Sequence, residues 1–210
     1  MNRFEKLVSL GFVCLAVALM TACIPEFENA LPGPSPGGMD CDLLGSWAPE
    51  DGSAVMFFTP EASGWLKMVS FELSKETPEL GQADLIMVDC FTSAVGESKY
   101  LCVRQEAGGG SPCVKSESEG RTFYLIVQYR ITAAHTLEIR HLNEDYLVEM
   151  VEKGKLKGAI DSMGSVKTPK VTASSEELAE FFRAADPARL IDDTDTMILK
   201  YSKPLDTDNL

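Results

Sequence analysis

Apolar and polar residues alternate with a period of two in two segments of the chain, residues 121–132 and 136–142, and this period is typical of β-strands. The clearest run is 121–132, where every second side chain from Phe123 to Ile131 is apolar. Short segments rich in β-branched and aromatic residues, separated by Pro and Gly, predict further strands. Together the predicted strands cover residues 53–58, 64–73, 83–91, 99–105, 121–132, 136–142, 156–162 and 196–202.

Two later segments change to the 3.6-residue spacing of an amphipathic helix. Residues 143–154 begin with Asn143, a residue type that caps helices well. The segment 174–185 begins with Ser174 and Glu177, the reciprocal pair of a capping box, and its apolar residues form one stripe. Helices are therefore expected in these two segments, late in the chain.

About eight short strands without regular β–α alternation predict a mainly β (α+β) fold. The expected architecture is a closed or nearly closed antiparallel barrel of about eight strands, with the C-terminal helix packed on it. The stretch "LLGSW" (43–47) resembles the Gly-x-Trp opening of lipocalins. That resemblance implies that Trp47 plugs one end of a lipocalin-like barrel and that Gly45 permits a close approach. The order of elements is also similar to that of small bacterial lipoproteins with a lipocalin-like body, a resemblance that implies no activity.

The first residues have the pattern of a secretory signal. Arg3 and Lys6 precede residues 7–22, which carry no charge and end in a small pair, Thr and Ala. A helix needs roughly 20 apolar residues to cross a bilayer, so this stretch is short for a transmembrane anchor. We therefore expect residues 1–22 to be a signal peptide that is removed.

The signal ends in "LMTAC" (19–23), which resembles the bacterial lipobox except that Met20 stands where leucine is more usual. The resemblance implies a lipid anchor at Cys23, with diacylglycerol on the thiol and a further chain such as palmitate on the amine. Two or three chains, at about 0.8 kcal/mol per buried CH₂, hold a protein durably on a bilayer. Ile24 in place of aspartate implies the outer membrane of a bacterial envelope, facing the periplasm. The alternative is an ordinary secreted protein with an incidental cysteine.

Residues 23–40 combine the lipidated cysteine with a segment rich in Pro and Gly and without apolar periodicity. Such chain extends by about 3.1 Å per residue, so it could hold a domain up to about 50 Å from a bilayer. We expect it to be a tether, and we expect residues 41–210 to form a single domain.

Four cysteines remain once Cys14 leaves with the signal and Cys23 takes lipid. An even number in an oxidising compartment favours two disulfides, and sequence allows three pairings. The Gly-rich loop "EAGGGSP" favours a disulfide that closes it, and the two cysteines that are left would then form the second disulfide. The favoured pairs are Cys102–Cys113 and Cys41–Cys90.

The formal net charge of −13 makes nucleic acid a poor partner, because an acidic surface repels phosphate. The domain has two histidines, His135 and His141, and no hydrolase or metalloprotease motif. Asp89 interrupts an apolar strand, where we expect a rim position satisfied by a backbone group or a basic partner. We therefore expect no enzyme, no metal site and no cofactor.

Two functions fit these observations. The first is a structural or interaction module, a filled barrel that docks a protein of the envelope while the bilayer holds it through Cys23. The alternative is a lipocalin-like module for a small apolar ligand, since an eight-stranded barrel is just wide enough for one. Its candidate lining residues are Trp47, Trp65, Phe71, Phe123 and Tyr129.

The lipid anchor gives the first testable prediction. The substitution Cys23→Ser removes the thiol that would carry diacylglycerol, so it should abolish acyl-chain labelling and release the protein from membranes. Labelling with a clickable fatty acid, followed by membrane fractionation, measures both effects. Cys14→Ser is the matched control and should leave both unchanged, whereas persistent labelling of the Cys23→Ser protein would contradict the lipobox interpretation.

Overall fold

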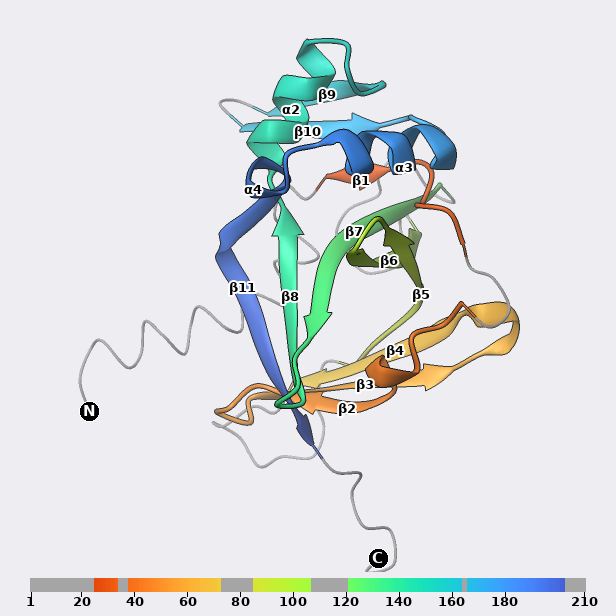
Figure 1. The fold of residues 1–210 in the computed structure, drawn as a ribbon, viewed down its shortest axis with the longest axis vertical. Helices are drawn as coiled ribbons and strands as arrows, with labels where there is room; N and C mark the ends of the chain where they lie inside the picture. Colours follow the sequence, from red (N-terminus) through yellow and green to blue (C-terminus); the bar gives the residue numbers. More distant parts are fainter. Residues whose placement is uncertain (1–24, 34–37, 73–84, 107–120, 164–165, 203–210) are drawn as a thin grey trace, which may run out of the picture.

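The structure, a computed structural model, describes residues 25–33, 38–72, 85–106, 121–163 and 166–202. Its body is a closed antiparallel barrel of eight strands, which confirms the predicted fold class (Figure 1). In ring order the strands are β2 (Gly45–Ala48), β3 (Ala54–Pro60), β4 (Leu66–Glu72), β5 (Leu85–Val95), β6 (Ser98–Glu106), β7 (Thr122–Ile131), β8 (Thr136–Leu142) and β11 (Ile191–Ser202). The last strand, β11, pairs with both β8 and β2, and this closes the ring.

The barrel has eight strands, as predicted, but one of the predicted segments lies outside it and another segment takes its place. The segment predicted at 156–162 forms β9 (Gly158–Met163), which lies outside the barrel, and β2 takes its place in the ring. With only four residues, β2 is too short to display a period of two. β10 (Val166–Val171) was missed because Pro169 argues against a strand, and β1 (Glu26–Phe27) because it has two residues.

The strands outside the ring form a small sheet that continues from β7. β1 pairs antiparallel with β7 and parallel with β10, and β10 pairs antiparallel with β9. The helices are α2 (Glu144–Glu152), α3 (Ser175–Ala184) and the short α4 (Pro187–Leu190). Together they form a cap over one side of the barrel (Figure 1).

Both long helices begin where the capping residues predict. The Asn143 side chain accepts a hydrogen bond from the backbone N–H of Tyr146 at 3.0 Å. Ser174 and Glu177 form the complete reciprocal capping box of α3. Each cap satisfies a backbone donor that the first turn leaves without a partner, so these short helices start at defined positions.

The protein has two hydrophobic cores that share one wall. The first fills the barrel, and the second lies between the outer side of β5–β7 and the cap. On β6, Leu101 and Val103 belong to the barrel core, whereas Tyr100 and Cys102 belong to the cap core. Strand β6 is therefore buried on both faces, which explains its uninterrupted apolar run.

The N-terminal segment corrects the predicted tether. Residues 25–33 are folded into the cap core, where Phe27 is fully buried and Leu31 is 1% exposed. The ring of Phe27 lies 6.5 Å from that of Phe182 on α3, and the Asn29 side chain donates to the carbonyl of Ala173. The folded domain thus includes residues 25–33, which the prediction assigned to the tether. The apolar residues of this segment are too few to show a period, so Pro and Gly dominated the prediction.

At Gly45 the chain makes the close approach that the lipocalin resemblance implies. Gly45 has a φ of +117°, and a Cβ there would lie 2.7 Å from the ring of Tyr201. Trp47 is 1% exposed inside the barrel core, and its Nε1 donates to the carbonyl of Leu43 at 2.8 Å. The ring of Tyr201 packs edge-on against Trp47 at 5.2 Å. Only glycine permits this close approach.

The described cysteines are free thiols. Cys41 is exposed, whereas Cys90 is buried in the barrel core, so the expected Cys41–Cys90 disulfide is not formed. Cys102 lies on the opposite face of the same wall and is also free, so the expected Cys102–Cys113 disulfide is not formed either; Cys113 itself lies outside the described residues. Burial raises the pKa of Cys90 and of Cys102 to about 12, which disfavours the reactive thiolate.

The packing of residues 25–33 in the cap core predicts that a substitution there lowers stability, which would not be expected of a flexible tether. Phe27→Ala should lower the free energy of unfolding by about 3–5 kcal/mol, because it opens a cavity in the cap core. The control Ile198→Ala truncates a side chain that is 54% exposed and should change stability little. Urea denaturation of the two variants measures the difference. Equal stabilities would mean that residues 25–33 do not belong to the folded domain.

Candidate docking surface

An apolar patch lies on the outer face of three neighbouring barrel strands. Met56, Phe58 and Met68 point into the barrel core, so the residues between them on β3 and β4 point outward. The register brings these outward residues into two rows across β3, β4 and β5. We name these rows the outer apolar patch; its residues are Val55, Phe57, Val69, Phe71, Leu85 and Met87.

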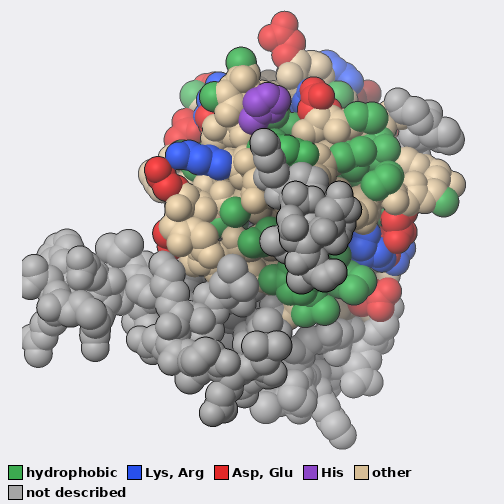
Figure 2. Space-filling view, turned by 90° about the horizontal axis from the view of Figure 1, so that it is seen from below, with side chains coloured by type: hydrophobic (Ala, Val, Ile, Leu, Met, Phe, Trp, Pro, Cys, Tyr) green, Lys and Arg blue, Asp and Glu red, His purple; other side chains and the backbone are tan. Residues whose placement is uncertain are grey.

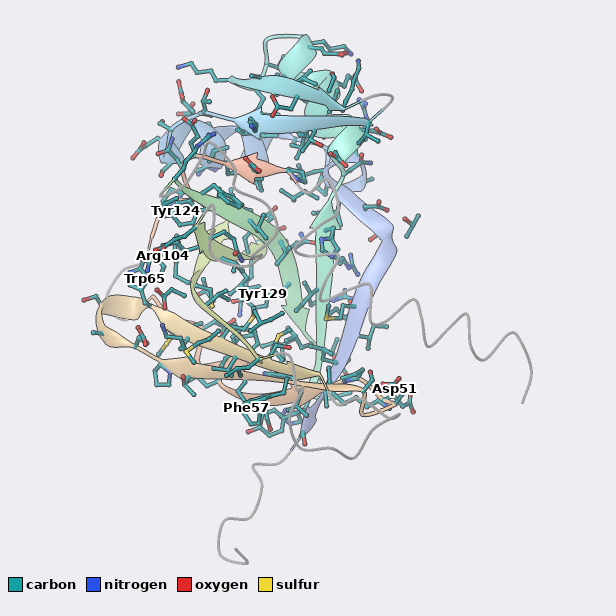
Figure 3. All side chains as sticks on the ribbon, turned by 180° about the vertical axis from the view of Figure 1, so that it is seen from behind. Asp51, Phe57, Trp65, Arg104, Tyr124 and Tyr129 are labelled. Atoms are coloured by element: carbon teal, nitrogen blue, oxygen red, sulfur yellow. The ribbon has the colours of Figure 1, made fainter. Side chains whose placement is uncertain are left out.

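The patch is open to solvent. Leu85 is 53% and Met87 is 58% exposed, and the other four side chains are half-buried. Phe57 and Phe71 pack edge-on at 6.0 Å, and Phe57 points away from the barrel interior (Figure 3). Hydrophobic side chains gather on this side of the molecule (Figure 2). Contiguous exposed apolar surface of this kind marks interaction sites, because it is unfavourable in water.

A charged row borders the patch. Asp89 binds two cations, Lys67 through one carboxylate oxygen and Arg104 through the other at 2.5 Å. Lys67 also lies 3.5 Å from Glu61. The hydrogen bond to Asp89 raises the pKa of Lys67, so this ammonium stays charged. Asp89 thus points outward and is paired with basic side chains. The sequence predicted either such a basic partner or a backbone group for it.

Aromatic rings continue the surface beyond the charged row. The guanidinium of Arg104 lies 5.3 Å from the ring centre of Trp65, within the range of a cation–π contact. Phe91 bridges Trp65 and Tyr124, with ring centres 5.1 Å and 6.5 Å away. Trp65, Arg104 and Tyr124 lie along one side of the barrel exterior (Figure 3). Arg104 thus contacts both the carboxylate of Asp89 and the ring of Trp65.

The five predicted ligand-lining residues do not share a cavity. Trp47 and Tyr129 are buried in the barrel core, and Phe123 packs against it half-buried. Phe71 and Trp65 lie on the outside, the first in the outer apolar patch and the second against the cap core. Successive strand residues point to opposite faces, so an aromatic residue's face depends on a register that sequence alone does not reveal.

Packed side chains occupy the barrel centre. Trp47, Phe58 and Leu137 are each at most 1% exposed and belong to one continuous cluster. Two hollows, of about 220 Å³ and about 320 Å³, lie instead near the β5–β6 turn. The residues around the first are Gly38, Asp40, Thr92, Ser93, Ala94, Lys99 and Tyr129.

Asp40 is the centre of a polar network in the smaller hollow. The hydroxyl of Tyr129 donates to its Oδ2 at 2.8 Å, and Lys99 lies 2.7 Å from the same atom. Burial opposes ionisation of Asp40, but hydrogen bonds from Lys99 and Tyr129 outweigh it and lower the pKa of Asp40. Burial, and then the neighbouring carboxylate, raise the pKa of Tyr129. The network joins residue 40 to β6 and β7.

Comparison of the chain with family models, with curated proteins and with solved structures found no match. Among the described residues, no helix combines the length and the apolar character that crossing a membrane requires. The same residues bring no three His, Cys, Asp or Glu side chains close enough to share a metal ion. What the structure defines is a closed β-barrel with a filled centre and an exposed apolar face.

Sequence reasoning missed the outer apolar patch, although a signal was present. The segments 53–58 and 83–91 are apolar at nearly every position instead of at every second one, and 64–73 has apolar residues at both odd and even positions. In an antiparallel barrel, a strand that is apolar on both faces either has a second layer over it or leaves one face exposed. The cap covers β6 in this way, whereas β3 and the first half of β5 have no described element over them.

The Asp40 network gives a pH-dependent prediction. The pKa of Asp40 is lower in the folded protein than in the unfolded chain, so its contribution to stability is present above pH about 4 and is lost as pH falls through the folded pKa. Asp40→Asn should therefore cost about 1–2 kcal/mol at pH 7 and nearly nothing in strong acid. Denaturation at several pH values measures this, with the exposed turn substitution Glu97→Gln as control. A pH-independent difference would contradict the assignment.

Proposed function

We propose that this protein is a lipid-anchored lipoprotein of a bacterial envelope and works as an interaction module. The bilayer holds it through Cys23, and the outer apolar patch docks a protein partner. The observation that carries the docking part of the proposal is the patch itself, two rows of apolar side chains exposed on a rigid sheet. A rigid surface loses little conformational freedom on binding, which favours affinity.

The filled barrel supports a surface partner over an internal ligand. An apolar ligand inside the barrel would have to displace Trp47 and Phe58, whose packing stabilises the fold. The hollow next to Asp40 is small, about 220 Å³, and holds the charged pair Asp40 and Lys99, so it does not suit a fatty acid or a similar chain.

The charge of the protein indicates what the partner looks like. Each copy carries a formal net charge of −13, so two copies repel one another at long range. A different protein whose apolar strip is flanked by Lys or Arg would be attracted, and such complementarity raises association rates. We therefore expect a basic, apolar-faced partner rather than a second copy of this chain.

Position-specific photocrosslinking tests the docking surface. A photoreactive amino acid replaces Met87 in the patch or, as control, Ile198, which is similarly exposed on β11. After irradiation of intact cells, the Met87 protein should form one discrete adduct, and the Ile198 protein should not. The crosslinked peptide of the partner should carry apolar residues flanked by Lys or Arg. Val69→Glu, within the patch, should abolish the adduct.

Three results would overturn the proposal. An adduct of twice the mass of the chain would mean self-association through the patch. Equal adducts at Met87 and Ile198 would mean random encounter. An apolar ligand that co-purifies with the folded domain and is detected by native mass spectrometry would favour the binding-module alternative.

A further inference from the structure

The N-terminal strand is fixed in the structure from its first described residue. Pro25 is buried, and β1 is held on both sides, with Glu26 opposite Lys170 and Phe27 opposite Tyr124. The backbone N–H of Glu28 also donates to the carbonyl of Val171 at 2.9 Å. Residues 25–28 therefore cannot swing as a flexible tether would.

The distance from the proposed lipid anchor to this fixed strand is short. Cys23 is two residues from Pro25, so their Cα atoms lie at most about 7 Å apart. The headgroup region on each side of a bilayer is about 5–8 Å thick. If the acyl chains on Cys23 enter the hydrocarbon, Pro25 must therefore lie at the headgroups.

The direction of β1 identifies the part of the fold nearest the anchor. Because β1 runs parallel to β10, the chain before Glu26 is directed toward the start of β10, where Val166 is 44% exposed. The next residue, Lys167, is bound to Glu152 at 2.6 Å and is about half-exposed. Consecutive strand residues point to opposite faces, so the Lys167 side chain lies away from that of Val166, whose exposed apolar side chain suits a membrane interface by itself.

Resting on the proposed anchoring at Cys23, we infer that the start of β10, which carries Val166, lies against the lipid surface. The domain then sits directly on the bilayer instead of standing off from it. The cap faces the membrane, while β3 and β4, at the other end of the molecule, face away (Figure 1). This orientation leaves the outer apolar patch accessible to a partner.

Depth-dependent quenching tests the orientation on the full lipidated protein. Val166→Trp and Ile198→Trp each add one indole at an exposed strand position, one beside the proposed contact and one remote from it. In phosphatidylcholine vesicles with brominated acyl chains, the added fluorescence at 166 should fall by roughly half, because a side chain at the boundary meets the bromines. The fluorescence added at 198 should not change. The parent protein, with Trp47 and Trp65, supplies the background to subtract.

Flotation of the same vesicles separates the two proposals. If the lipidated protein floats and its Cys23→Ser variant does not, the anchoring stands and the quenching decides the orientation. Equal quenching at both positions, or none at 166 in a floating protein, overturns the orientation alone. A lipidated protein that fails to float overturns the anchoring and the orientation together. Unchanged unfolding temperatures in both tryptophan variants show that the comparison is made on folded protein.

Discussion

Closure of the barrel depends on one close contact at the seam between β2 and β11. Only three residue pairs join the two strands, and at their centre Tyr201 lies opposite Trp47 with its ring over Gly45. A Cβ at position 45 would press on the ring of Tyr201, and the φ of +117° is one that glycine adopts and other residues rarely do, so another residue there would weaken one of the two shortest ladders of the ring. Without the seam, β2 would have a free edge and the barrel core would be open to water. The resemblance to lipocalins identified these residues before the strand itself could be recognised.

The shared wall of β5–β7 couples the barrel to its cap. Because β6 contributes residues to both cores, neither layer can move far without repacking the other. The cap core also includes Phe27 and Leu31, so the first residues of the folded domain help to hold α3 against the barrel. The protein is therefore one cooperative unit in which the N-terminal strand, the helices and the barrel support each other.

The sequence predicted what local chemistry determines and missed what tertiary pairing determines. The capping residues Asn143 and Ser174 gave the starts of two helices, because a cap acts within one turn. β1 and β10 were missed because their pairing partners, not their own residues, make them strands. The candidate ligand residues failed for a similar reason, since whether Phe71 points inward depends on the register of β4 with β3. The outer apolar patch was recognisable only once the cap was seen to cover β6 and not β3.

The pairing of β1 with β10 also has a consequence for the order of folding. Glu26 lies opposite Lys170, so the ladder joins residues from nearly opposite ends of the folded domain. Such a contact carries a large loop-closure cost and forms late, after the intervening strands have brought its two halves together. During synthesis, the segment that holds Phe27 gains its first strand partner with Tyr124, and its other partners, Val171 and Phe182, are made much later. The earliest part of the domain to be synthesised is thus among the last to reach its final place.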